Sequence, residues 1–101
     1  MPRSPNFKLI TTSKTSLRAT IATLTPASLP PEREAIRAAV NQWIRTSGAF
    51  DGVVDFDAAL RDPADPVRLR REYDSGDHIH PSDAGYAAMA NAVPLAAIAG
   101  K

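Results

Sequence analysis

The sequence predicts an α/β fold in which helices flank a parallel sheet in three layers, and it predicts only part of such a fold. Two runs typical of strands, residues 19–25 and 52–56, enclose a helical run at 31–46. Alternation of this kind is typical of layered α/β domains with parallel strands. Apolar residues make up 44% of the chain and charged residues 23%, as in globular proteins. The length of 101 residues falls below the roughly 200 expected for a complete doubly wound domain.

Residues 1–18 are predicted to be a flexible basic leader, and residues 19–101 the folded part. The leader leaves room for at most a short strand at 7–10, and no acidic residue precedes Glu32. Basic tails can bind nucleic acid, but four charges spread over 18 positions do not form a patch. We therefore expect no nucleic-acid partner. The four basic residues are Arg3, Lys8, Lys14 and Arg18.

The first strand and the first helix are read from their side-chain patterns. Residues 19–25 alternate β-branched and small side chains and end at Pro26, as expected for a buried parallel strand. Pro30 and Pro31 open a helix that runs to about Thr46, with acids in its first turn and Gly48 near its end. We expect an apolar stripe to face the core, with Trp43 packing rather than stacking on a sugar. The stripe is Ile36, Val40, Trp43 and Ile44, and the polar positions elsewhere are Glu32, Arg37, Asn41 and Arg45.

Two aspartates flank Phe56 at the end of the second predicted strand, residues 52–56. The ligand clefts of parallel sheets tend to lie at such strand ends. Asp55 and Asp57 could form the carboxylate pair of a glycosidase. Capping of the following turn, residues 58–61, is the favoured interpretation. Residues 62–66 read as a rigid turn and 67–73 as an exposed helical turn. Its arginines are expected to face solvent, although one could reach a substrate carboxylate: Arg68, Arg70 and Arg71.

The last predicted helix begins after Ser82, whose hydroxyl can cap it. Pro94 should kink this helix or start a new short turn. Gly85 has two competing interpretations, a close approach of the helix to a strand or a functional role. The side chains expected to dock on the sheet are Tyr86, Met89, Ala90 and Val93.

Composition excludes several function classes. The chain has no cysteine, which rules out disulfides, thiolate catalysis and zinc-finger chemistry but does not indicate a compartment. No run approaches the roughly 18 apolar residues of a membrane span. Residues 1–16 lack the apolar segment of a signal peptide, so the localisation stays open.

Both histidines lie in one short block, residues 76–86. Asp77 precedes His80 by three positions, and Pro81 and Ser82 favour a turn before the helix. Histidine can exchange protons near neutrality. A carboxylate on its far nitrogen fixes the tautomer and stabilises the imidazolium formed when a serine loses its proton. Asp77 and His80 are therefore the candidate catalytic residues.

This block resembles the last motif of the SGNH hydrolases, or GDSL lipase/esterase family, which reads Asp-x-x-His-Pro and usually continues to Gly-Tyr. Residues 22–26, 40–45 and 50–56 are similar to the same family, and the resemblance covers about residues 19–99. It implies a flavodoxin-like sheet and an ester hydrolase in which Asp77 orients His80. The pattern is most similar to a bacterial branch that includes secreted esterases found beside polysaccharide-degrading enzymes. The implied substrate is a small ester, with acylated carbohydrates among the candidates.

The residues that this family places earlier in its chain are missing. Its Gly-Asp-Ser nucleophile motif does not occur, and Ser75-Gly76-Asp77 has the letters in another order. The glycine and the Asn-Asp motif of the oxyanion hole are missing too. We therefore expect residues 19–101 to be the C-terminal part of an SGNH hydrolase domain, with little or no turnover alone. A complementing N-terminal chain would be its partner.

Two other functions compete with this interpretation. The first is a metal-binding module, because His78 and His80 alternate near three aspartates and imidazole with carboxylate suits zinc, nickel or manganese. The other is a noncatalytic α/β remnant or interaction module. We expect no cofactor. The three aspartates are Asp74, Asp77 and Asp83.

Overall fold

The fold is built around two short parallel strands joined through a helix. The computed structural model describes residues 18–96. Strand β1 (Thr20–Ala22) leads into helix α2 (Pro31–Thr46) and then into β2 (Gly52–Val54). The strands pair in parallel, with Thr20 opposite Gly52 and Ala22 opposite Val54. The predicted alternation is therefore confirmed, although both strands are shorter than their sequence patterns suggested.

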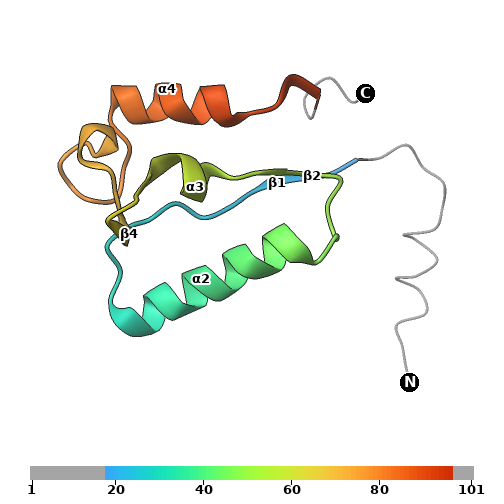
Figure 1. Ribbon diagram of the computed structural model, residues 1–101, viewed down its shortest axis with the longest axis horizontal. Coiled ribbons are helices and arrows are strands. Elements are labelled where there is room, and N and C mark those ends of the chain that lie inside the picture. The colour runs from blue at the N-terminus through green and yellow to red at the C-terminus, as the bar shows by residue number, and fades with distance from the viewer. Residues whose placement is uncertain (1–17, 97–101) are drawn as a thin grey trace.

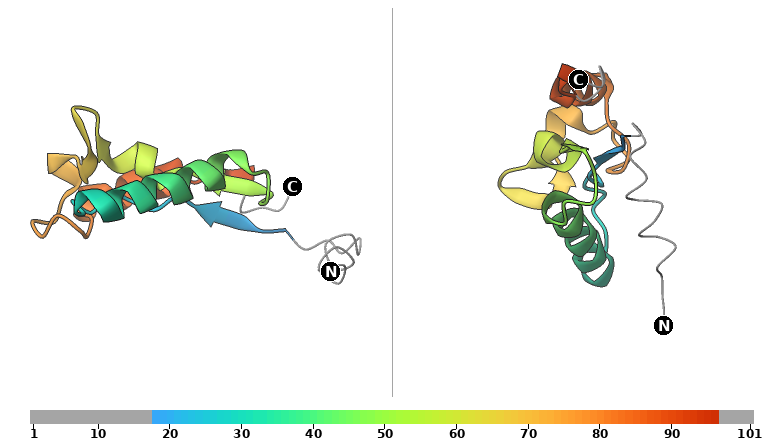
Figure 2. Two further views of the ribbon diagram at one scale, coloured as in Figure 1. Left: turned by 90° about the horizontal axis from the view of Figure 1, so that it is seen from below. Right: turned by 90° about the vertical axis from the view of Figure 1, so that its right-hand side faces the viewer.

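Helices lie on both sides of this strand pair, so the expected three-layer α/β arrangement is confirmed. Figures 1 and 2 show α2 on one side and α4 (Asp83–Ala92) on the other. Helix α4 contacts α3 (Phe56–Leu60), which follows β2 directly. Residues 1–17 of the predicted leader, with its short strand at 7–10, lie outside the described residues.

A small hairpin replaces the rigid turn and helical turn predicted for residues 62–73. Strands β3 (Arg61–Asp62) and β4 (Asp65–Leu69) pair antiparallel, and only the last part forms a 3-10 helix, η1 (Arg71–Tyr73). The Asp62 carboxylate accepts the amide of Ala64 at 2.9 Å, which closes the turn between the strands. Leu69 is buried beside the fully buried Leu60, so burial of this side chain overrides the helical tendency of the segment. The predicted exposure of Arg68, Arg70 and Arg71 is confirmed.

The orientation predicted for α2 was wrong. Ile36 and Trp43 are 64% and 54% exposed, whereas Asn41 is 1% exposed and Arg37 is buried. Of the predicted apolar stripe only Ile44 is buried. Trp43 packs edge-to-face on Phe50, with ring centroids 5.6 Å apart. The helix therefore turns a largely polar stripe toward the strands.

This polar stripe is stabilised by direct bonds to the chain that follows β1. The Asn41 side chain accepts from the Leu24 amide at 2.7 Å and donates to the Leu24 carbonyl at 2.9 Å. An Arg37 guanidinium nitrogen also donates to that carbonyl at 2.9 Å. Because a buried polar group is costly only when it lacks partners, these bonds make polar burial acceptable here.

The two aspartates after β2 are held by arginines. Asp57 accepts from Arg37, Arg45 and Arg61 at 2.7, 2.8 and 3.0 Å. Burial opposes ionisation of Asp57, but these bonds outweigh it and lower its pKa. Asp55 accepts the amide of Ala58 at 3.1 Å, so the predicted capping role is confirmed. Asp55 also accepts from Arg45 at 2.8 Å. Carboxylates bonded to arginine are poorly suited to the proton-donating role that a glycosidase needs.

Acid should weaken this part of the fold. Hydrogen bonds from Arg45 lower the pKa of Asp55 to about 2, from an ordinary 3.8. A lowered pKa stabilises the folded chain above the unfolded value, and the contribution is lost as pH falls toward 2. We expect the urea midpoint to decline between about pH 5 and pH 2, and to decline less in Asp55→Asn. An equally steep decline in both proteins would contradict this assignment.

None of the helices in residues 18–96 has the length and apolar character that crossing a bilayer requires.

Candidate functional site

The two histidines lie on one closed loop between η1 and α4. Asp74 and Pro81 form an isolated antiparallel bridge at its base. The amide of Ser75 donates to the His80 carbonyl at 3.0 Å, and the amide of Ser82 donates to the Tyr73 carbonyl at 2.8 Å. We call residues 74–81 the histidine loop. Backbone hydrogen bonds fix both ends of this loop, so its side chains extend from a backbone that is held in place.

Helix α4 anchors the C-terminal end of this loop. The Ser82 hydroxyl accepts from the amide of Gly85 at 3.2 Å and donates to the Glu72 carbonyl at 2.8 Å, which confirms the predicted cap. At Gly85 a Cβ atom would lie 2.7 Å from the Tyr73 carbonyl oxygen. The predicted close approach therefore exists, but its partner is η1 and not a strand.

The predicted docking face of α4 was only partly right. Met89 and Val93 are half-buried, whereas Tyr86 and Ala90 are exposed. The contact with η1 at Gly85 sets the rotation of the helix and leaves Tyr86 outside. The helix ends at Ala92, and residues 95–96 are helical again after Pro94, in agreement with the predicted new turn.

Asp77 is the central acceptor of the histidine loop. One of its oxygens, Oδ1, accepts the amides of Ile79 and His80 at 2.9 and 2.8 Å, and the Ser75 hydroxyl at 3.2 Å. Its Oδ2 lies 2.5 Å from His80 Nδ1. The amide and the ring of His80, followed by the amide of Ile79, lower the pKa of Asp77 well below its ordinary value. The carboxylate is therefore ionised and fixed in orientation at neutral pH.

This arrangement determines which nitrogen of His80 is available. An ionised carboxylate can only accept hydrogen bonds, so Nδ1 must carry the proton that faces Asp77. In the neutral ring Nε2 then keeps its lone pair. The His80 side chain is 68% exposed. It thus presents a proton acceptor to the outside of the chain.

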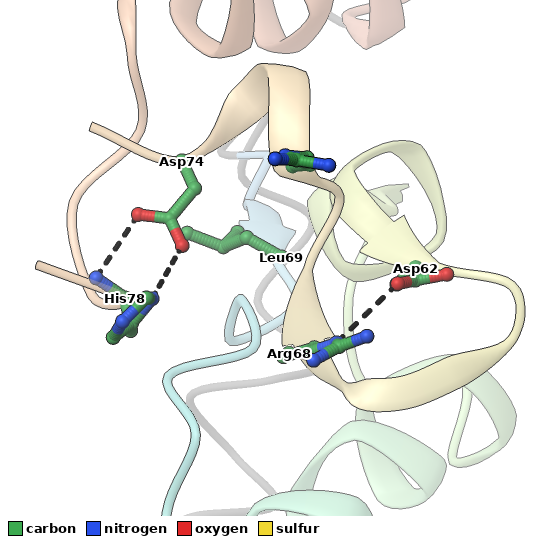
Figure 3. Close-up of a pocket in the computed structure, with 6 residues that line it drawn as sticks. Asp62, Arg68, Leu69, Asp74 and His78 are labelled. Atoms are coloured by element: carbon green, nitrogen blue, oxygen red, sulfur yellow. Dashed lines mark hydrogen bonds and ion pairs between the residues drawn. The ribbon is translucent and has the colours of Figure 1, made fainter. Parts of the chain in front are cut away.

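A second aspartate–histidine pair lies on the same loop, and sequence reasoning did not single it out. Asp74 Oδ2 lies 2.7 Å from His78 Nδ1, while Oδ1 accepts the amides of Gly76 and His78 at 2.8 and 3.0 Å (Figure 3). His78 has a φ of 67°, a left-handed conformation that is uncommon outside glycine. Its four-residue spacing from Asp74 was the available signal, but only the backbone conformation turns the ring toward that carboxylate.

The structure separates the two histidines that the metal hypothesis joined. His78 pairs with Asp74 and His80 pairs with Asp77. Across the described residues, no three His, Asp or Glu side chains converge in a group that could hold a metal ion. The third candidate, Asp83, lies in the first turn of α4. These contacts do not support the metal hypothesis.

Neither serine near the Asp77–His80 pair is placed as a nucleophile. The Ser75 hydroxyl donates to Asp77 Oδ1 at 3.2 Å. The Ser82 hydroxyl is occupied by its capping bonds. Within residues 18–96, no serine hydroxyl bonds to the His80 ring.

A comparison with family models places this arrangement among known proteins. The model of the GDSL-like Lipase/Acylhydrolase family matches residues 3–88, which is most of the chain. The chain belongs to this family. The matched range runs from before β1 to the middle of α4. This match confirms the family resemblance and the α/β fold class expected from the sequence. It also indicates a fold of the ester-hydrolase type. The comparison with curated proteins gave no match.

Proposed function

We propose that this GDSL-like chain supplies the acid–base half of a serine esterase. The observation that carries the proposal is the Asp77–His80 pair: an ionised carboxylate 2.5 Å from Nδ1, with an exposed ring beyond it. In serine hydrolases this pairing allows the opposite nitrogen to take the proton of a serine hydroxyl. His80 is the proposed general base and Asp77 the proposed positioning residue.

The proposed reaction follows from this arrangement in two halves. His80 Nε2 takes the serine proton as the serine oxygen forms a bond to the ester carbonyl carbon. The imidazolium, stabilised by Asp77, gives that proton to the leaving alcohol, and the acyl group remains on the serine. His80 then removes a proton from water, whose oxygen attacks the acyl-serine. Release of the acid returns the proton to the serine. The substrate is a small ester.

We propose that the serine comes from a segment outside this sequence. The sequence contains no Gly-Asp-Ser tripeptide, and the hydroxyls of Ser75 and Ser82 are engaged elsewhere. Exposed apolar side chains on α2, including Ile36 and Trp43, offer a surface that such a segment could cover. Residues 19–101 would then be the C-terminal part of the active domain. Without that segment the chain should show little or no turnover, because loss of the nucleophile removes most of the catalysis.

Complementation tests this function. The chain is co-expressed with the segment of a GDSL-like acylhydrolase that carries its Gly-Asp-Ser motif, and hydrolysis of p-nitrophenyl acetate is measured. We call this pair the complemented enzyme. We expect activity that is missing from either part alone and that falls by about 10³-fold or more in His80→Ala. Circular dichroism of each variant checks folding.

Three outcomes would contradict the proposal. The first is activity in the complemented enzyme that survives His80→Ala. The second is a folded pair without activity, which would favour the noncatalytic interaction module. The third is activity of the isolated chain that depends on His80, which would place a nucleophile within this sequence.

A further inference from the structure

An open pocket lies beside the histidine loop, between that loop and the β3–β4 hairpin. It has a volume of about 270 Å³. Neither Asp77 nor His80 lines it, although His78, two positions before His80, does. Figure 3 shows Asp74 and His78 on one side and the hairpin residues Asp62 and Arg68 on the other. The lining residues are Asp62, Arg68, Leu69, Arg71, Asp74 and His78.

The two carboxylates of this pocket are already satisfied. Asp62 accepts from the amide of Ala64 at 2.9 Å and from Arg68 at 3.4 Å. Asp74 accepts two amides of the histidine loop, and its second oxygen faces His78 Nδ1. A ligand rich in donors would have to compete with these bonds, several of which close a turn of the backbone. The pocket therefore offers little free acceptor capacity.

The hydrogen-bond donors of the pocket that remain free belong to a cationic side chain, Arg71. Among the described residues Arg68 pairs with Asp62 and Asp65, and Arg70 pairs with Glu72. No carboxylate of residues 18–96 lies within ion-pair distance of Arg71. A guanidinium has five donors in a planar fork that matches the two oxygens of a carboxylate. Arg71 is therefore the side chain of this pocket whose guanidinium donors are available to an anion.

We propose that this pocket binds a carboxylate group through Arg71, and that the esters hydrolysed with His80 carry such a group. The substrate class rests on the proposed function, whereas binding of the carboxylate does not. The occupant is small, because the pocket volume is below that of most drug-sized sites. Leu69 is the apolar residue among the six that line the pocket.

Binding is tested on the full chain with two matched esters. Amide chemical shifts are followed by nuclear magnetic resonance during titration with monomethyl succinate, which carries one carboxylate, and with uncharged dimethyl succinate. We expect saturable shifts at Gly76 and His78 with the monomethyl ester, and at least tenfold weaker binding of the dimethyl ester. A charge-assisted pair contributes enough for a loss of roughly 10- to 100-fold in Arg71→Gln.

Arg70→Gln is the matched control, because Arg70 is adjacent in sequence, bonds to Glu72 and does not line the pocket. It should bind monomethyl succinate as the unaltered chain does. Equal weakening in both variants, or equal binding of the two esters, would overturn the proposal. Inorganic phosphate that binds more tightly than monomethyl succinate would overturn the choice of a carboxylate.

The pocket and the proposed function can fail separately. The titration needs no catalysis, so carboxylate binding with an inactive complemented enzyme would leave the pocket assigned and refute the esterase. An active, His80-dependent enzyme whose chain binds monomethyl succinate no more tightly than dimethyl succinate would refute the pocket and leave the esterase.

Discussion

Asp77→Asn should reduce ester hydrolysis by the complemented enzyme by about 10⁴-fold, a loss of the size seen when the carboxylate of a serine protease triad becomes an amide. The amide can still accept the amides of Ile79 and His80 through its oxygen, so the loop keeps its shape. Its nitrogen, however, would donate toward His80 Nδ1, where Asp77 Oδ2 now accepts. The ring would then carry its proton on Nε2 and could not take one from serine. The rate constant kcat for p-nitrophenyl acetate is the measurement.

Asp83→Asn is the control for this change. Asp83 lies on the same stretch of chain, in the first turn of α4, and belongs to neither histidine pair. We expect its kcat to stay within a few-fold of the unaltered enzyme. If both variants lose activity alike, the loss reflects general charge or stability and Asp77 has no special role.

Asp57→Asn should lower the free energy of unfolding by about 3–5 kcal/mol, the usual cost of removing one partner of a buried ion pair. Asp57 and Arg37 side chains are each 6% exposed and lie 2.7 Å apart. The amide keeps the shape of the side chain but removes the charge shared by the three arginines that bond to it. Among the described residues Arg37 would then keep Glu34, at 2.7 Å, as its carboxylate partner. Urea denaturation followed by circular dichroism measures the change.

Asp65→Asn provides the comparison for this result. Asp65 also contacts an arginine, Arg68, but at 3.6 Å and with both side chains largely exposed. Exposed pairs contribute at most about 1 kcal/mol, so this variant should be nearly as stable as the unaltered chain. Similar losses of unfolding free energy at both positions would show that the effect at Asp57 does not come from burial of its ion pair.

Local signals in the sequence were sufficient for the strand–helix–strand unit and for the contact between Asp77 and His80. Pro31 fixes where α2 begins, Ser82 caps α4, and Asp77 lies three positions before His80 in a turn-forming block. Each signal acts over a few residues, so it needs no knowledge of tertiary contacts. The family resemblance added the function class, which spacing alone could not give.

The errors arose where tertiary contacts decide. In α2 two stripes share helical spacing, and the bonds of Arg37 and Asn41 to Leu24 select the polar one. Hydrophobicity alone favours the other stripe. At β4 the burial of Leu69 produces a strand that local propensity did not indicate. The Asp74–His78 pair depends on the positive φ of His78, which sequence rarely reveals outside glycine.

The central claim is that Asp77 prepares His80 to accept a proton at Nε2. The most direct test is to record the ¹⁵N shifts of the His80 ring in the isolated chain, at a pH where those shifts show the ring to be neutral. We expect the proton on Nδ1 and a lone pair on Nε2, with that preference lost in Asp77→Asn. A His80 ring protonated on Nε2 in the unaltered chain would contradict the account, because it could not serve as the general base.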